Sequence, residues 1–208
     1  MMNSAEFTER SRAEWVAAGY RALKPHIVAR IKGGVLHTMH FTYTRRDSHV
    51  WWSAVPLAQP DLSLHRGAPG TCGRVPKADA PLTQPPLSDE QLCASIARAV
   101  EDDVMVTLDA LCDLGALCDR VDTKASVIAH FVRAFACLQD GRFENGRENL
   151  RAFLSDARLA PQQGLTVLDA ERRTAEALLE ATDDAQRAIV AEHYAANVKR
   201  LRLASLLR

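Results

Sequence analysis

The chain has 208 residues, of which 47% are hydrophobic and 25% charged, so we expect it to fold rather than remain disordered. Its apolar runs fall short of a membrane-spanning helix, and its N-terminal residues lack the apolar stretch of a secretory signal. We therefore expect a cytoplasmic protein without a membrane partner. The five cysteines, an odd number with no Cys-x-x-Cys pair, argue against a disulfide framework and against a structural zinc site.

Charge is distributed unevenly along a chain whose formal net charge is zero. Residues 1–87 hold 11 Lys and Arg and 6 Asp and Glu, a net +5, whereas residues 88–208 hold 15 and 20, a net −5. The two parts either attract each other or face different partners.

The N-terminal part has the pattern of a helix followed by a sheet. Residues 5–23 are predicted to be helical, because Pro25 follows them and small or apolar side chains recur on one face, namely Phe7, Ser11, Trp15, Ala18 and Ala22. The period then changes to 2, which predicts strands over 27–32, 35–44 and 49–55. Residues 1–56 are therefore expected to form a small module, a helix with a three-stranded antiparallel meander.

Matching apolar positions across neighbouring strands predicts the register of this meander. A three-residue loop pairs Ile31 with Val35, and a four-residue loop over 45–48 pairs Phe41 with Trp52. The two aromatic residues then lie at the centre of the core face. The N-terminal helix is expected to cover that face, since so small a sheet needs a cover to be stable.

The second face of the predicted sheet is the candidate binding surface. In this register His26 lies opposite His40, and Trp51 lies opposite Thr42. Aromatic, hydroxyl and basic side chains together can stack a base or a sugar, or dock a protein; the alternative is that this face packs on the helical domain. The candidate residues are His26, His40, Thr42, Arg45, Arg46, His49, Trp51 and Ser53. No carboxylate or cysteine joins the histidines there, so no metal is expected.

Residues 57–87 are rich in proline and glycine and are predicted to be a loop or an interdomain linker. Spaced glycines and basic side chains make part of it a candidate for anion binding, because glycine lets backbone N–H groups approach an anion. The residues are Arg66, Gly67, Gly70, Gly73 and Arg74. The stretch lacks the Gly-Lys-Ser/Thr ending of a nucleotide-binding loop, and the alternative is a flexible loop.

Residues 88–208 are predicted to form an all-α domain of about five antiparallel helices, which makes the chain an α+β protein. A capping box at Ser88 opens the first helix, which Gly115 stops or kinks. Thr123 begins the second helix and Gly141 ends it. The remaining three are expected over 143–158, 165–181 and 182–206, and Thr182-Asp183-Asp184 is expected to cap the last of them.

The helix pair over 127–161 resembles a tetratricopeptide-type hairpin. The resemblance rests on small residues, a turn glycine, an aromatic residue and a terminal proline, namely Ala134, Gly146, Gly141, Phe143 and Pro161. It covers about one sixth of the chain and implies repeat-like packing. His130 stands where the aromatic signature begins and no second copy follows, so the ordinary packing of a helical hairpin is the alternative.

The sequence contains no nucleophile motif, no strong metal set and no nucleotide fingerprint, which favours a non-enzymatic protein without a cofactor. We expect a binding or regulatory protein whose helical domain and exposed sheet face engage a macromolecule, first of all a protein. Open sheet edges also allow a homo-oligomer. One alternative is nucleic-acid binding by the basic N-terminal half. The other is an enzyme whose cleft combines the histidines with acidic residues of the first long helix, namely Asp102, Asp109 and Asp113.

Overall fold

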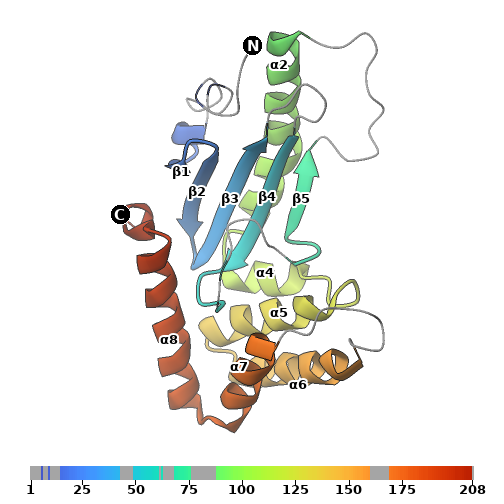
Figure 1. Cartoon of the computed structure of the whole chain (residues 1–208), viewed down its shortest axis with the longest axis vertical. Coiled ribbons are helices and arrows are strands. Elements are labelled where there is room, and N and C mark those ends of the chain that lie inside the picture. Colours follow the sequence, from blue (N-terminus) through green and yellow to red (C-terminus); the bar gives the residue numbers. More distant parts are fainter. Residues whose placement is uncertain are drawn as a thin grey trace.

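A computed structural model describes residues 15–42, 49–60, 68–75, 88–159 and 169–207, together with Glu6, Glu9 and Leu62. The fold is α+β, as predicted, and contains one antiparallel sheet of five strands in the order β1-β2-β3-β4-β5 (Figure 1). The strands are β1 (Arg21–Lys24), β2 (Ile27–Lys32), β3 (Val35–Thr42), β4 (His49–Pro56) and β5 (Cys72–Val75). The predicted meander is the centre of this larger sheet, and two four-residue strands form its edges.

The helices follow the sheet in the sequence. A nearly continuous helical segment comprises α2 (Asp89–Ala99), the π-helix η1 (Val100–Met105) and α3 (Val106–Ala110). After it come α4 (Leu114–Arg120), α5 (Val127–Gln139), α6 (Phe143–Leu159), α7 (Asp169–Glu180), α8 (Asp183–Arg200) and the 3₁₀ helix η3 (Leu203–Leu206). No helix among the described residues combines the length and apolar character needed to cross a membrane.

The first long helix begins as predicted but ends earlier. Ser88 Oγ accepts a hydrogen bond from the Gln91 N–H at 3.2 Å, and Gln91 Oε1 accepts one from the Ser88 N–H at 3.0 Å, which completes the capping box. Asp113 then caps a new helix by accepting from the Ala116 N–H at 2.8 Å. Gly115, predicted to stop the helix, therefore lies inside α4, because the aspartate before it is a strong N-cap.

The β2–β3 hairpin has a two-residue turn instead of the predicted three-residue loop. Lys32 pairs with Val35, and both turn glycines have positive φ (54° and 80°), as a type I′ turn requires. Ile31 consequently pairs with Leu36, and the predicted pairing of Ile31 with Val35 is wrong. A shift of one residue moves every β2 side chain to the face opposite the predicted one.

The β3–β4 register differs from the predicted one by two residues. Trp52 pairs with Met39 rather than with Phe41, and Trp51 pairs with His40. The residues between the two strands, which include the predicted loop, lie outside the described part of the chain. A shift of two keeps each β3 and β4 side chain on its predicted face, so the two tryptophans point to opposite faces as expected.

The face that carries Trp52 and Phe41 forms the main core. It packs on α2, η1, α3 and α4, and α2 crosses behind the sheet in Figure 1. The inward residues of these helices include the run predicted from the sequence, namely Ile96, Val100, Val104, Leu108 and Leu111. The sheet and the helices that follow residue 88 therefore share one apolar core.

The end of the predicted N-terminal helix packs against this core. Trp15 is 3% exposed, and its ring centroid lies 6.0 Å from that of Phe41. Gly19 has φ 82°, and the Tyr20 N–H donates to the Trp15 carbonyl at 2.9 Å, which ends the helical turn. Residues 21–23, predicted to be helical, belong to β1. Most of the predicted helix before Trp15 lies outside the described residues.

The C-terminus of the chain closes part of the opposite face of the sheet. α8 passes beside α5 and ends near the sheet, which brings the end of the chain close to β1 and β2 (Figure 1). The Asn197 amide donates to the carbonyls of Leu57 at 2.8 Å and Gln59 at 2.7 Å. Leu203 is fully buried among apolar residues of β2, β3 and β4, namely Ile27, Ala29, Leu36 and Val55. Strand β2 is therefore buried on both of its faces.

The segment predicted as a loop over 57–87 contributes to the sheet, because it contains β5. Ser53 and Cys72 pair across β4 and β5, and Leu57, Leu62 and Ala68 are fully buried. The segment is rich in proline and glycine, and its described parts are nevertheless packed into the fold.

Helices α5 to α8 build a second apolar cluster around Phe131, Phe135 and Phe153. Gly141, with φ 79°, follows α5 as predicted. A Cβ on Gly146 would lie 2.6 Å from the Leu138 side chain, so glycine is needed for the close packing of α5 and α6.

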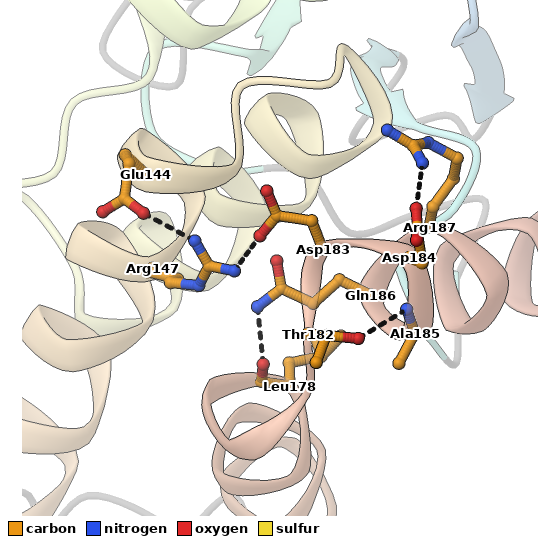
Figure 2. Close-up of polar contacts among 9 residues, drawn as sticks. All are labelled: Glu144, Arg147, Leu178, Thr182, Asp183, Asp184, Ala185, Gln186 and Arg187. Atoms are coloured by element: carbon orange, nitrogen blue, oxygen red, sulfur yellow. Dashed lines mark hydrogen bonds and ion pairs between the residues drawn. The ribbon is translucent and has the colours of Figure 1, made fainter.

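A polar junction connects α6, α7 and α8 (Figure 2). Arg147 in α6 donates to Glu144 at 2.6 Å and pairs with Asp183 at the start of α8. Thr182 caps α8, as predicted, and the Gln186 amide donates to the Leu178 carbonyl at 2.6 Å. These contacts fix the short connection between α7 and α8.

Candidate functional site

Trp51 stands at the centre of the candidate surface. It belongs to β4 and is 44% exposed, and its cross-strand neighbours are His40 in β3 and Arg74 in β5. Cross-strand partners lie on the same face of a sheet, so the three side chains stand side by side. The His49 ring lies edge-on to Trp51, with ring centroids 5.9 Å apart. We call the set His26, His40, Thr42, His49, Trp51 and Arg74 the Trp51 surface.

His26 reaches the Trp51 surface from the turn between β1 and β2. It was predicted to pair with His40 across two strands, but Ile27 occupies that position. The Phe41 N–H donates to the His26 carbonyl at 2.9 Å, which holds the turn against β3. The imidazole rings of His26 and His40 consequently lie 4.7 Å apart. The two histidine side chains lie next to each other as predicted, but His26 comes from the turn before β2 and not from a paired strand position.

Other predicted members of the site are placed differently. Thr42 is half-buried and pairs with His49 rather than with Trp51. Ser53 is 3% exposed, and its Oγ lies 2.7 Å from the Thr38 Oγ1, so these hydroxyls satisfy each other in the interior. Arg45 and Arg46 lie outside the described residues.

The glycines of the candidate anion loop pack against protein groups. Gly70 has φ 85°, and a Cβ there would lie 2.3 Å from the Arg120 carbonyl oxygen at the end of α4. A Cβ on Gly73 would lie 2.8 Å from the Trp52 ring. Close packing therefore explains both glycines. Arg66 and Gly67 lie outside the described residues, and Arg74 belongs to the Trp51 surface.

The histidines and the acidic helix do not share a cleft. Asp109 in α3 contacts Arg30 on the core face of the sheet, whereas His40 and His49 lie on the opposite face. Within the described part of the chain, no group of three or more His, Cys, Asp and Glu side chains is placed to hold a metal ion. The enzyme hypothesis assumed one cleft that combines the histidines with the acidic helix, and the placement of Asp109, His40 and His49 on opposite faces does not support that cleft.

A buried polar cluster that we did not predict connects β2, β3 and α3. Arg30 Nε donates to His37 Nδ1 at 3.0 Å, and its terminal nitrogen pairs with Asp109 at 2.5 Å. A guanidinium can only donate, so His37 Nδ1 is unprotonated and Nε2–H donates to the Leu111 carbonyl at 2.8 Å. Burial lowers the pKa of His37 from 6.5 to about 4, which keeps the ring neutral.

The cluster is structural in character. His37 is fully buried, and Arg30 is 8% exposed with its guanidinium 4.7 Å from the centroid of the Tyr20 ring. The polar groups thus satisfy one another between sheet and helix, and of the three only Asp109 reaches the surface. The signal that could have revealed them is that a two-residue turn at Gly33-Gly34 places Arg30 directly opposite His37.

Comparison of the chain with protein-family models, with curated proteins and with solved structures finds no match.

Proposed function

We propose that the chain is a non-enzymatic binding or regulatory protein that engages another protein through the Trp51 surface, assisted by its helical region. One observation carries the proposal. Trp51 is 44% exposed, although His49 and Ser53, two residues before and after it on the same face of β4, are 7% and 3% exposed. The described residues around Trp51 on this face are largely buried, whereas its large aromatic side chain stays open to solvent.

The chemistry of the Trp51 surface suits a protein partner. An indole offers a broad apolar face and one N–H donor, which is why tryptophan is enriched among the residues that dominate protein interfaces. The half-buried side chains of His40 and Arg74 stand beside it and carry N–H groups of the kind that donate to carboxylates and carbonyls. We therefore expect the partner to present an apolar side chain beside acidic ones.

Trp51→Ala tests this proposal. Covering the exposed part of the indole removes about 100 Å² of apolar surface from water, worth roughly 2 kcal/mol, or about a 30-fold change in affinity. The tagged wild-type chain and the variant are each used to capture proteins from native cells, and a captured protein is then purified for calorimetry. We expect an affinity loss of this size for Trp51→Ala.

Val106→Ala is the matched control, because Val106 is 65% exposed in α3, behind the opposite face of the sheet. It should bind like the wild type. A captured set that is the same for the wild type and Trp51→Ala would contradict the proposal. Recovery of untagged copies of the chain itself would identify the partner as a second copy.

A second candidate function is binding of single-stranded nucleic acid. The placement of Arg74 directly opposite Trp51 favours it, since a base can stack on an indole while a nearby cation contacts phosphate. A salt titration with a labelled oligonucleotide distinguishes the two functions. Affinity that falls steeply as salt rises supports nucleic-acid binding, and no binding at low salt rejects it.

A further inference from the structure

Two buried cysteines face each other across the contact between α4 and α5. Cys118 is 1% exposed and Cys137 is 2% exposed, and their sulfur atoms lie 3.0 Å apart. This separation is shorter than the sum of two sulfur van der Waals radii. A disulfide bond measures about 2.05 Å, so the two atoms need to approach by only about 1 Å to form one.

The surroundings of the pair differ between the two sulfurs. The hydrogen bond between the thiols lowers the pKa of Cys137 and raises the pKa of Cys118. The guanidinium groups of Arg142 and Arg133 also lower the pKa of Cys137. The surroundings of Cys137 therefore favour the thiolate, the reactive form of cysteine, more than those of Cys118 do.

We propose that Cys118 and Cys137 are a redox pair that a peroxide oxidises reversibly to an intrachain disulfide, which fastens α4 to α5. The Cys137 thiolate attacks one peroxide oxygen and breaks the O–O bond, which leaves a sulfenic acid and, with one proton, releases water. The Cys118 sulfur then attacks the Cys137 sulfur, breaks its S–O bond and releases a second water. Two thiols and one hydrogen peroxide thus give one disulfide and two waters, and a dithiol reductant reverses the change.

The position of the pair gives this disulfide a structural effect. α4 packs on the sheet core through Leu114 and Leu117, whereas α5 belongs mainly to the second apolar cluster. A bond between Cys118 and Cys137 links these two parts and closes a loop of the chain between them. Restriction of the unfolded chain by such a loop raises the melting temperature of a protein of this size by about 5–10 °C.

The experiment treats the full chain with hydrogen peroxide, blocks the remaining thiols and digests the protein with trypsin without reduction. Cleavage after Arg and Lys separates Cys118, in peptide 99–120, from Cys137, in peptide 134–142. We expect a linked pair of these peptides in mass spectra, a monomer on non-reducing gels and the stated rise in melting temperature. Dithiothreitol should reverse all three.

Cys112 shares the first peptide, so Cys112→Ala serves as the matched control and should keep the link. Cys118→Ala and Cys137→Ala should each lose the link and the rise in melting temperature. The wild-type peptide map needs no variant and decides the matter even if a variant fails to fold. A peroxide-treated protein in which Cys72, Cys93 or Cys112 is oxidised while peptides 99–120 and 134–142 stay unlinked would overturn the proposal, as would a link that persists in Cys118→Ala.

Discussion

His37 makes a specific prediction about stability and pH. The folded protein holds its ring neutral because burial lowers its pKa to about 4, whereas the unfolded chain has the ordinary value of 6.5. Between these values the unfolded chain binds a proton that the folded protein does not, so acid favours unfolding. The stability contribution is present above pH 6.5 and is lost as the pH falls towards 4. The difference of about 2.5 units between the two pKa values corresponds to roughly 3 kcal/mol in the free energy of unfolding.

Urea unfolding of the wild type and His37→Gln at several pH values between 7 and 4 measures this effect. Carboxylates contribute to acid destabilisation in both proteins, so the difference between the two pH profiles isolates His37. The wild type should lose about 3 kcal/mol more than the variant over this range. Parallel profiles would refute the reasoning, as would a His37 ring signal in NMR that titrates near 6.5.

Two further substitutions test the packing of the fold by urea unfolding. Gly70→Ala and Gly141→Ala both place a side chain at positive φ, but only Gly70 has a backbone oxygen within 2.3 Å of the new Cβ. Gly141→Ala should lower the free energy of unfolding by about 1 kcal/mol, and Gly70→Ala should lower it clearly more. Equal losses in the two variants would contradict the close contact of Gly70 with the Arg120 carbonyl. Asn197→Ala removes both hydrogen bonds to the carbonyls after β4 and should cost about 1–3 kcal/mol, and an unchanged stability would show that α8 is not held there.

The β2 register shows why alternation of apolar and polar residues failed as a guide. The predicted three-residue loop avoids pairing Lys32 with Val35, whereas the two-residue turn makes that pair and brings Arg30 to the core face. In the structure Arg30 lies on that face because His37 and Asp109 satisfy it, and Ile27 is buried on the other face under the C-terminal segment. A strand buried on both faces carries no reliable alternation, so turn chemistry was the better signal.

The features predicted correctly depend on local chemistry. The capping box at Ser88, the cap at Thr182 and the glycine after α5 involve residues close together in the sequence, which a single chain reveals directly. The Trp51 surface was predicted in part, because β3 and β4 kept their faces. Arg74 was assigned to a different site, since no pattern in so short a strand indicated that β5 pairs with β4 beside Trp51.

The division of charge between the two parts of the chain bears on the choice of partner. Part of the positive charge of residues 1–87 is paired within the molecule, because Arg30 and Lys32 both lie near Asp109 of the acidic part. Arg21 likewise donates to the Ser205 carbonyl in the C-terminal segment at 2.7 Å. A nucleic-acid site needs several cations that contact phosphates. Because Arg21 and Arg30 bond within the fold, the nucleic-acid candidate depends on Arg74 beside Trp51 and on the remaining basic residues of this part of the chain.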